Sequence, residues 1–497
     1  MARMIKRIVI AGGGTAGWMA AAALAKTCGH MLQVQLVESD TLGTIGVGES
    51  TIPPLRAFHQ LLKIDEAEFM RATAATFKLG VNFEGWGTQH SDYMHAFGTT
   101  GRESWIAGFQ HLWLLARERG LAADFGDYCF ELKAARAHKF ELSANAPMQY
   151  AYHLDASRYA HFLRRFSERH GAVRIEGKIV RVEQNVDSGF IEALTLESGQ
   201  QVHGDLFIDC TGFKGLLIEQ TLNTGFEDWS HWLPCDSAWA VQTEAVDAPV
   251  PFTRAIAHGA GWRWRIPLQH RVGNGLVYSS HHLDEAAARR QLLAEIVGEP
   301  VTEPRLIRYR TGRRLHAWRH NCIALGLAAG FVEPLESTGI HLFMTAITRL
   351  LQMLPLDKIC PSVVREYNAQ TRREIEKIRD FIVLHYHVSQ RADTPFWRLC
   401  RSMELPPGLQ DKIDLFRESA QVFREEGDPF RADSWTQVML GQGLNPAEHH
   451  PVAATMTDEA LTGYLSQIQH TIEQRVAALP AHQSFLARYC PMEAERP

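Results

Sequence analysis

The sequence has no excess of positive charge and no closely spaced cysteines. Lysine and arginine total 51, against 56 aspartate and glutamate residues, so the formal net charge is −5. A chain that binds nucleic acid irrespective of base sequence needs a dense basic surface, which this balance does not supply. The eight cysteines include no CxxC pair, which argues against a zinc site and against a disulfide framework. We therefore expect reduced cysteines, no metal ion and no nucleic-acid partner.

Long hydrophobic runs are absent as well. The most apolar stretches, Ala16–Ala25 and Ile323–Val332, are each about half the roughly 20 residues that cross a bilayer. The first residues, Met1–Arg7, lead directly into a strand-like segment, without the apolar region and small-residue cleavage site of a secretion signal. We expect a cytoplasmic protein that is neither secreted nor bound to a membrane.

The composition that is present is that of a folded, soluble chain. Its 497 residues are 45% hydrophobic and 22% charged, which is ordinary globular usage. At roughly 150 residues per domain, this length predicts two or three compact units or one enzyme-sized body. Helical patterns dominate the last third, over Leu342–Leu354, Val363–Leu384 and much of Thr457–Leu479.

The N-terminal segment has the pattern of a βαβ unit. A β-branched stretch, Ile5–Ala11, precedes the glycine-rich Gly12–Gly17, and an alanine-rich helix then covers Trp18–Cys28 before a second strand, Gln33–Glu38. The glycines fit GxGxxG, the signature of a dinucleotide site when it lies between a strand and a helix. The alternative is an ordinary glycine-rich turn.

Each position of the signature has a physical task. Gly12 permits the tight turn, Gly14 lets the backbone approach a pyrophosphate at the helix N-terminus, and Gly17 allows close helix packing. Glu38, at the end of the second strand, can accept a hydrogen bond from a ribose hydroxyl. A later apolar strand ends at Asp209 and adds a candidate contact to the same cofactor, with a plain strand and turn as its alternative. FAD and NAD fit this pattern equally.

Three further segments distinguish the chain from other dinucleotide-binding proteins. They are FKLG at Phe77–Gly80, a WxWxIP sequence within Gly261–Pro267, and GFVEPLESTGI at Gly330–Ile340. Together with GxGxxG they resemble the flavin-dependent tryptophan halogenase family, in order from Ile8 to about Trp397. The resemblance implies an α/β fold with a Rossmann-like FAD-binding module of the flavin monooxygenase type, mixed β-sheets and a mainly helical C-terminal module.

The resemblance also implies a division of the chain. Residues 1–350 would form a discontinuous FAD-binding core, with substrate-pocket insertions around residues 55–150. Residues 351–497 would form a mainly helical substrate-binding lid packed on that core.

The activity implied is that of a two-component enzyme. A separate NAD(P)H-dependent flavin reductase would supply FADH2, and O2 with chloride or bromide would yield hypohalous acid that halogenates indole, an indole derivative or tryptophan. The absence of a second GxGxxG in a strand–turn–helix context agrees with an external source of reduced flavin. The alternatives are an aromatic hydroxylase of the flavin monooxygenase type, which ordinarily lacks WxWxIP and the FKLG lysine, and a catalytically silent flavin-binding protein. The sequence does not decide between a monomer and a homodimer.

Two residues match the catalytic positions of the family. Lys78 would hold or covalently carry the hypohalous acid, and Glu336 would polarise the halogenating species and take the proton from the substituted ring. Without the resemblance, Lys78 would be a surface lysine and Glu336 a helix cap. The backbone amides of Thr338 and Gly339 would bind halide, as helix N-termini bind anions, with Ile340 against the flavin.

The resemblance assigns a tryptophan pair and further contacts to the flavin. Trp262 and Trp264 would shield the flavin from organic substrate and so suppress hydroxylation, with strand packing as the alternative. Gly43–Thr51 would be a flavin strap loop. The cofactor contacts added by the resemblance are Thr15, Ala16, Gly48, Ser50, Val180 and Leu327.

The substrate pocket follows the family less closely. His95 and Phe97 would line an indole pocket, because aromatic walls hold an electron-rich ring and select the carbon that faces the lysine. In the C-terminal lid only Phe430 remains of an aromatic pair, and Glu425 is the candidate acid for a substrate ammonium. Since unpaired buried charges are costly, this departure places free tryptophan in doubt and favours indole-type aromatics as a class.

Overall fold

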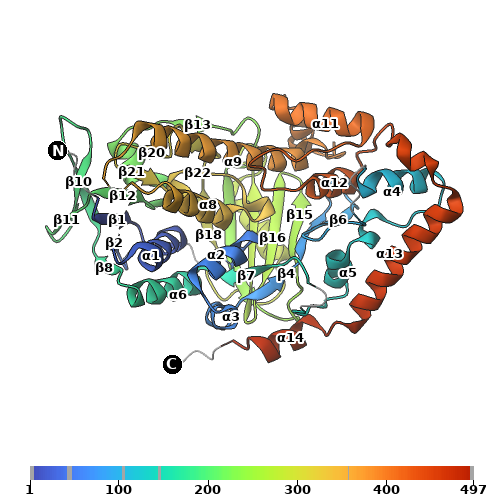
Figure 1. Cartoon of the computed structure of the whole chain (residues 1–497), viewed down its shortest axis with the longest axis horizontal. Coiled ribbons are helices and arrows are strands. Elements are labelled where there is room, and N and C mark those ends of the chain that lie inside the picture. The colour runs from blue at the N-terminus through green and yellow to red at the C-terminus, as the bar shows by residue number, and fades with distance from the viewer. Residues whose placement is uncertain (1–4, 42–47, 103–106, 144–146, 356, 493–497) are drawn as a thin grey trace.

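The computed structural model describes residues 5–41, 48–102, 107–143, 147–355 and 357–492. The molecule is elongated, with the parallel sheet near the N-terminus at one end and C-terminal helices at the other (Figure 1). Mixed sheets and helices form the body, as the family resemblance implied. Among the described helices, none is long and apolar enough to cross a bilayer.

The predicted βαβ unit is confirmed and begins a six-stranded sheet in the order β20-β21-β12-β1-β2-β8. Its inner strands run parallel, with Val9 of β1 opposite both Phe207 of β12 and Gln35 of β2. The elements of this region are β1 (Arg7–Ala11), α1 (Thr15–Cys28), β2 (Gln33–Glu38), β8 (Val173–Glu176), β12 (Leu206–Asp209), β20 (Trp318–Arg319) and β21 (Cys322–Ala324).

Two glycines of the signature are required by their surroundings. Gly12 has φ +106°, and a Cβ there would lie 2.3 Å from the carbonyl oxygen of Cys210, so only glycine fits the turn. A Cβ on Gly17 would lie 1.9 Å from the Gly12 oxygen, which explains how α1 packs so closely on the turn. Gly14 precedes the first residue of α1, and of the described atoms none lies within 4 Å of where its Cβ would be.

A seven-stranded sheet, β18-β14-β17-β16-β15-β5-β6, occupies the middle of the molecule. It is antiparallel except where β15 pairs with β5, and the segment with the WxWxIP sequence, Gly261–Pro267, is its β16. Its strands are β5 (Gly80–Glu84), β6 (Asp92–Ala96), β14 (Ser237–Glu244), β15 (Thr253–His258), β16 (Gly261–Pro267), β17 (Arg271–Tyr278) and β18 (Arg305–Arg308).

A small three-stranded sheet carries the FKLG lysine. It consists of β3 (Gly48–Ser50), β7 (Ala151–Asp155) and β4 (Thr76–Lys78), with β7 in the centre. His153 of β7 is opposite both Ser50 of β3 and Thr76 of β4. Because directly opposed residues, and residues two apart on one strand, share a face of a sheet, Lys78 lies on the same face as these three side chains.

Two other small sheets and several short turns complete the strand structure. The sheets are β11-β10-β9 and β13-β19-β22. Their strands are β9 (Ile179–Gln184), β10 (Ile191–Leu196), β11 (Gln201–His203), β13 (Phe226–Asp228), β19 (Gly312–Arg314) and β22 (Gly330–Phe331). The short helical turns are η1 (Phe125–Tyr128), η2 (Gly212–Lys214), η3 (Leu216–Thr221), η4 (Gly326–Ala328), η5 (Pro334–Glu336) and η6 (Pro451–Thr455).

The last third is helical, as predicted. The predicted helix Val363–Leu384 is α9, which extends to His387. The helices that precede residue 330 are α2 (Pro54–Leu62), α3 (Glu66–Thr73), α4 (Phe109–Glu118), α5 (Phe130–Arg136), α6 (Ala156–Arg169) and α7 (Glu285–Glu295). The later helices are α8 (Gly339–Gln352), α9 (Pro361–His387), α10 (Pro395–Ser402), α11 (Pro407–Ser419), α12 (Ala432–Gly441), α13 (Asp458–Ala478) and α14 (His482–Tyr489).

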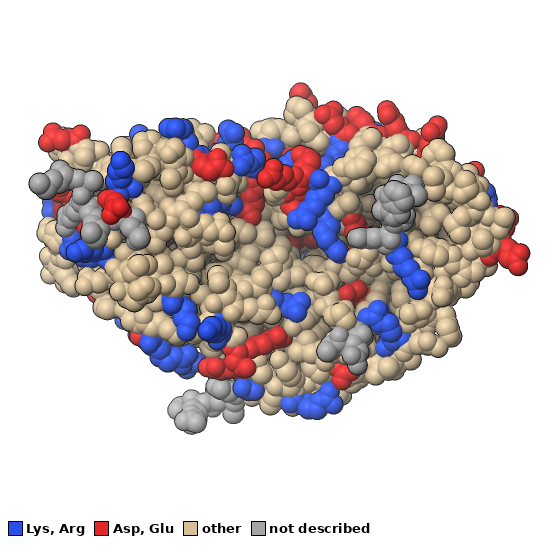
Figure 2. All heavy atoms as spheres, in the orientation of Figure 1, with Lys and Arg blue, Asp and Glu red and all other residues tan. Residues whose placement is uncertain are grey.

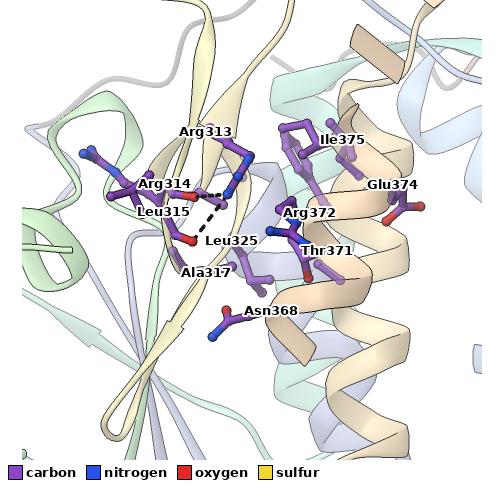
Figure 3. A pocket seen from close by; sticks show the side chains of 17 residues that line it. Arg313, Arg314, Leu315, Ala317, Leu325, Asn368, Thr371, Arg372, Glu374 and Ile375 are labelled. Carbon is purple, nitrogen blue, oxygen red and sulfur yellow. Dashed lines mark hydrogen bonds between the residues drawn. The ribbon is translucent and has the colours of Figure 1, made fainter. Parts of the chain in front are cut away.

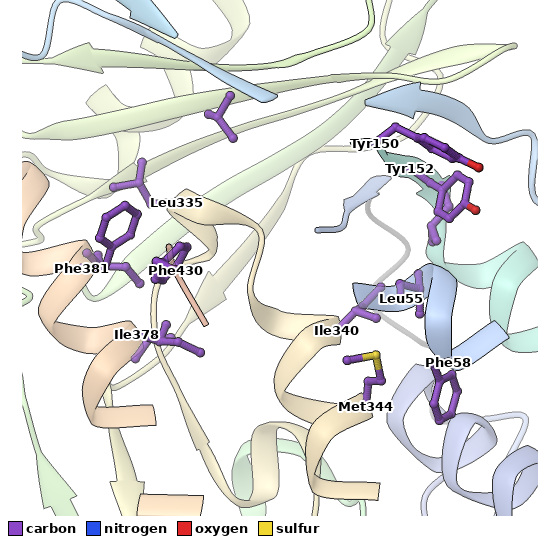
Figure 4. Close-up of a cluster of buried hydrophobic side chains, with 14 of the residues drawn as sticks. Leu55, Phe58, Tyr150, Tyr152, Leu335, Ile340, Met344, Ile378, Phe381 and Phe430 are labelled. Carbon is purple, nitrogen blue, oxygen red and sulfur yellow. The ribbon is translucent and has the colours of Figure 1, made fainter. Parts of the chain in front are cut away.

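One large hydrophobic cluster joins residues on both sides of position 350. In Figure 4 the side chains of Leu335, Ile378, Phe381 and Phe430 lie together beside α9, while Ile340 lies near Met344 and the residues of α2. The turn that contains Glu336 therefore lies between α2 and α8 on one side and α9 on the other. On the face that Figure 2 shows, both signs of charge are interspersed around a largely uncharged centre.

Candidate active site

A cavity of about 190 Å³ lies between β16, β3 and the start of α8. Its lining is mainly apolar and aromatic, which suits a flat, largely apolar ring system. Seven residues predicted to contact flavin or halide line it: Gly48, Ser50, Trp262, Trp264, Leu327, Gly339 and Ile340. We refer to it as the flavin cavity, because the side chains around it fit that cofactor.

The two tryptophans of WxWxIP face this cavity together. Trp262 and Trp264 are two residues apart on β16, so their side chains share one face of the sheet, and their ring centroids are 6.1 Å apart. The indole N–H of Trp262 donates to Glu333 Oε2 at 2.9 Å. This hydrogen bond fixes the orientation of one ring against the cavity.

The start of α8 offers unpaired polar groups at the cavity. Helix N-termini present backbone N–H groups that have no partner within the helix and attract anions. Within the described part of the chain, the buried Thr338 Oγ1 has no hydrogen-bond partner, and no atom lies within 4 Å of the position that a Cβ on Gly339 would take. The donor set and the open space fit a halide ion.

Two other residues predicted to contact the cofactor, Glu38 and Asp209, already accept hydrogen bonds from the protein. Glu38 Oε1 accepts from Arg174 Nε at 2.6 Å and Oε2 from Trp18 Nε1 at 3.3 Å, so its carboxylate is already partly engaged. Asp209 accepts four hydrogen bonds, from both donors of Thr211 and from two backbone amides of η3. Its carboxylate therefore holds that turn and keeps no free acceptor site.

Three other predicted cofactor positions lie elsewhere. Thr15 and Ala16 form the first residues of α1. Val180 lies on β9 with 55% of its surface exposed and does not line the flavin cavity. The predicted strap loop overlaps the described residues only from Gly48 onward.

Lys78 is fully buried at the end of β4. Its ammonium donates to the Thr51 carbonyl oxygen at 3.1 Å and to Ser337 Oγ at 2.8 Å, and it lies 5.1 Å from the centre of the Phe97 ring. Burial lowers the pKa of Lys78 to about 7, although the negative charge of Glu336 acts in the opposite direction. Burial therefore makes the neutral amine far more accessible near neutral pH than it is for an exposed lysine.

Ser337 connects Lys78 to the flavin cavity. It has φ +62°, a left-handed conformation that is uncommon outside glycine. This conformation turns the chain between η5 and α8 and brings Ser337 Oγ between Lys78 and Ser50, with a hydrogen bond to Ser50 Oγ at 3.0 Å.

Glu336 is fully buried between two histidines. His95 Nδ1 lies 2.9 and 3.0 Å from its two oxygens, and His385 Nε2 lies 2.8 Å from Oε1. Burial favours the protonated acid, but the two histidines outweigh burial and lower the pKa of Glu336 to about 2. The carboxylate is thus ionised over the whole physiological range and can accept a proton.

A second buried glutamate, Glu333, lies three residues earlier and has neutral partners. Its Oε2 accepts from Trp262 Nε1 at 2.9 Å and from the Tyr386 hydroxyl at 2.5 Å, and Oε1 has no partner among the described atoms. Burial raises the pKa of Glu333 to about 7.

The predicted substrate residues make contacts with Lys78, with Glu336 or with one another. The His95 ring is 6.4 Å from the Phe430 ring, and Phe430 stacks on Phe381 with 3.8 Å between centroids. Phe97 faces Lys78. His95 also contacts Glu336, so this residue does more than form an aromatic wall.

Glu425, the candidate acid for a substrate ammonium, already has cationic partners. It forms an ion pair with Lys377, and its Oε1 lies 3.1 Å from Lys412 Nζ. The two lysines neutralise the carboxylate that a substrate ammonium would need.

Several residues of this site were not identified from the sequence. His385 follows the predicted end of its helix by one residue, and Phe381 is one of many apolar residues in that helix. Thr51 and Ser337 belong to segments that were singled out, but their contacts to Lys78 follow only from the fold. No spacing rule links residues so far apart in the chain.

A smaller cavity of about 40 Å³ adjoins the flavin cavity and shares Gly330, Leu342 and Phe343 with it. Figure 3 shows Arg313 beside this cavity, where it donates to the carbonyl oxygens of Arg314 and Leu315. Across the described residues no group of three or more histidine, cysteine, aspartate or glutamate side chains is arranged to hold a metal ion.

Comparison with known proteins gives one consistent result. The family model described as tryptophan halogenase matches residues 7–458. Tryptophan 7-halogenase RebH of Lentzea aerocolonigenes is 35% identical over 98% of this chain and 99% of its own.

Solved structures agree along nearly the whole length. Xcc4156, a flavin-dependent halogenase from Xanthomonas campestris, is 56% identical with a TM-score of 0.98, over 99% of this chain and 100% of the other. BrvH, a flavin-dependent halogenase from Brevundimonas sp. BAL3, is 45% identical with a TM-score of 0.94, over 98% and 99% of the two chains. The chain therefore belongs to the tryptophan halogenase family, whose members are flavin-dependent enzymes of the oxidoreductase class.

Proposed function

We propose that the enzyme uses FADH2, O2 and chloride or bromide to make hypohalous acid, which Lys78 delivers to an electron-rich aromatic ring of the indole class. The observation that carries the proposal is the position of two fully buried, oppositely charged residues, Lys78 and Glu336, beside the flavin cavity. Bound reduced flavin and O2 would supply the oxidising equivalents that turn halide into an electrophile. The chain itself supplies positioning, exclusion of water and proton transfer.

The Lys78 nitrogen has three positions beyond its carbon, and two of them are occupied by hydrogen bonds, so one is left open. Two of its N–H groups donate to Thr51 and Ser337. The third position carries an N–H in the ammonium, which can hold hypohalous acid by a hydrogen bond, and a lone pair in the amine, which can bond to the halogen. A pKa of about 7 makes both forms of Lys78 accessible.

Glu336 suits the role of general base. Once the halogen has added to the ring, the ring carbon must lose a proton, and an ionised carboxylate held in place can take it. The contacts with His95 and His385 keep Glu336 ionised and fix its orientation. Trp262 and Trp264 would keep organic substrate away from the flavin, which disfavours hydroxylation.

The aromatic walls support indole-type substrates. The His95 ring lies near the Phe430 ring, Phe97 lies beside Lys78, and Phe381 stacks on Phe430. RebH is a halogenase of tryptophan by name, but Glu425 here is neutralised by lysines. We therefore favour indole or a substituted indole over free tryptophan.

The wider setting follows from the same proposal. A separate NAD(P)H-dependent reductase would provide FADH2 by diffusion, and the enzyme would act in the cytoplasm. Residues 351–497 would serve as the substrate-binding module, because His385, Phe381 and Phe430 all come from that part of the chain.

The test is mass spectrometry of the products formed by purified protein with FAD, a flavin reductase, NADH, O2 and either halide. Indole, tryptophan and a small aromatic panel are offered in parallel. We expect a halogen isotope pattern in an indole product. Hydroxylated product alone would replace this proposal with a flavin monooxygenase activity.

A further inference from the structure

A continuous chain of buried hydrogen bonds leads from Lys78 to His153. Lys78 Nζ donates to Ser337 Oγ at 2.8 Å, and Ser337 Oγ to Ser50 Oγ at 3.0 Å. Ser50 Oγ is 2.8 Å from Thr253 Oγ1, which is 2.9 Å from His153 Nε2. All five residues are less than 10% exposed. We call this set the hydroxyl relay.

The contacts of His153 with Thr76 determine which atom donates and which accepts in each hydrogen bond of the relay. Thr76 Oγ1 lies 2.7 Å from the Pro267 carbonyl oxygen, which can only accept, so the Thr76 hydroxyl donates there. Thr76 Oγ1 must then accept from His153 Nδ1, 3.0 Å away. In a neutral imidazole this leaves Nε2 as an acceptor.

The remaining hydroxyls follow in turn. Thr253 donates to His153 Nε2 and accepts from Ser50, and Ser50 accepts from Ser337. Each of these three hydroxyls therefore accepts a hydrogen bond from the neighbour nearer to Lys78 and donates one to the neighbour nearer to His153. This is the arrangement in which a proton can move from Lys78 to His153 by one hop at each group.

The fold explains why these groups meet. Ser50 and Thr76 are both opposite His153 in the small sheet, and Lys78 is two residues beyond Thr76. Opposed residues share a face, so three members of the relay, together with Thr76, are aligned by strand register alone. Ser50, Thr253 and Ser337 also line the flavin cavity, so the relay runs along its wall.

Electrostatics allow one excess proton on the pair of Lys78 and His153. Burial and the charge of Lys78 hold the pKa of His153 well below its usual range, with a smaller effect of His482. Once Lys78 loses its proton, the repulsion between the two cations disappears, while burial continues to lower the pKa of His153. The other titratable groups nearby are Glu336, which faces Lys78, and Glu49, which lines the flavin cavity.

We propose that His153 is a positioning residue that accepts a proton from Lys78 through Ser337, Ser50 and Thr253, and so generates the Lys78 amine that engages the electrophilic halogen. One N–H bond of Lys78 breaks, each hydroxyl passes on one proton, and a new N–H bond forms at His153 Nε2. The electrons of the broken N–H bond stay on Lys78 as a lone pair that faces Ser337, and rotation about the Cε–Nζ bond turns this lone pair to the third position, where the halogen can bind. The imidazole becomes a cation, and no electrons pass between residues. The proton returns along the same path when Lys78 is reprotonated. This inference rests on the proposed function.

The test interrupts the relay at Thr253, with a matched pair of variants. Thr253→Val keeps the shape of the side chain but removes the hydroxyl, whereas Thr253→Ser restores it. A second break, His153→Gln, retains an acceptor and a donor but cannot carry a proton as imidazole does. Thr73→Val is the control for loss of a buried threonine hydroxyl elsewhere, because Thr73 donates only to the Phe69 carbonyl oxygen.

The measurement is the amount of halogenated indole formed per hypohalous acid generated, between about pH 6 and pH 9. Hypohalous acid is quantified separately with an excess of thioether scavenger. In both relay-breaking variants we expect about a tenfold loss of this ratio near pH 6, because Lys78 remains an ammonium, and near-recovery at pH 9. Thr253→Ser should follow the wild type at every pH, and so should Thr73→Val.

A structural role alone would lower the ratio equally at all pH values. That result in either relay-breaking variant, or a wild-type profile in both, would overturn the relay. If the wild type itself formed no scavenger product and no halogenated indole, the proposed function would fail instead, so the two failures are distinguishable.

Discussion

Two glutamates in one turn, Glu333 and Glu336, are held by consecutive residues of one helix and end in opposite states. Both have no exposed surface. Tyr386 donates a hydrogen bond to Glu333, and the neighbouring His385 lies against Glu336. Burial raises the pKa of Glu333 to about 7, whereas burial is outweighed by two histidines at Glu336 and its pKa falls to about 2.

The difference shows that burial alone does not decide whether an acid is ionised. Hydrogen bonds from Trp262 and Tyr386 are too weak to offset the desolvation of Glu333, because neither donor can carry a positive charge at neutral pH. A histidine can be protonated and stabilise the carboxylate directly. Glu336 is therefore held as a carboxylate, and Glu333 orients Trp262 through their hydrogen bond.

The largest effect is expected from Lys78→Ala, which removes the cation that faces Glu336. Halogenation should be abolished, while oxidation of FADH2 by O2 and formation of hypohalous acid continue, because the electrophile is made without being delivered. Product mass spectrometry and oxygen consumption measure the two steps separately. Persistent halogenated product in this variant would exclude the delivery role of Lys78.

Glu336→Gln should slow halogenation by about 100-fold, with little loss of FAD binding, since an amide cannot take the ring proton. Glu333→Gln should change the same rate by less than about threefold, because an amide oxygen can still accept from Trp262. Single-turnover product formation measures both variants. Equal losses in the two would remove the functional distinction between these glutamates.

His385→Asn should raise the pKa of Glu336 part of the way toward the pKa of Glu333. With one histidine lost, burial raises the pKa of Glu336, so the acid limb of the pH–rate profile should move to higher pH, with about tenfold lower activity near pH 5. Tyr386→Phe is the matched control, because its hydroxyl contacts Glu333 and Cys235, and its acid limb should remain where it is in the wild type. An unshifted limb in His385→Asn would refute the role of this histidine.

The last prediction concerns the free energy of unfolding rather than catalysis, and it is made at Glu333. Its pKa of about 7 in the folded chain exceeds the ordinary value of 4.5, so the folded state binds more protons and its stability falls as pH rises from 4.5 to 7. Glu333→Gln removes this loss and should gain up to about 3 kcal/mol relative to the wild type between pH 4.5 and pH 8. Urea unfolding at both pH values provides the measurement.

Glu336→Gln should destabilise the chain equally at pH 4.5 and pH 8, and its difference from the wild type should shrink only when urea unfolding is extended toward pH 2. The depressed pKa of Glu336 contributes stability above about pH 4.5, which is lost as pH falls toward 2. Parallel pH dependence in the two variants would contradict the comparison.

Local pattern was sufficient for the βαβ unit, because its glycines and flanking strands occupy one short segment whose spacing carries the information. The choice of flavin over NAD and the roles of the WxWxIP segment and of the turn before Ile340 required the family resemblance. Lys78 required it too, because a single buried lysine has no spacing of its own. The helices of the last third were predicted from periodicity, without their partners.

Residues whose roles depend on tertiary contacts could not be predicted from the sequence. His385 and Glu336 are 49 positions apart, and His153 and Thr253 are 100 apart. Their roles depend on which strands pair and on the choice of tautomer, neither of which a hydrophobic pattern encodes. Glu425 shows the converse, since the sequence offered it as a substrate contact and the fold supplied two lysines instead.

Helix α14 has a consequence for how the strand of Lys78 is stabilised during synthesis. His482 of α14 accepts a hydrogen bond at 3.3 Å from the backbone N–H of Phe77, the residue before Lys78, and Phe485 packs on the Phe77 ring. Lys78 is made within the first sixth of these 497 residues, whereas His482 follows Phe77 by 405 positions. During translation the strand that carries Lys78 therefore waits for these two contacts until α14 has been made.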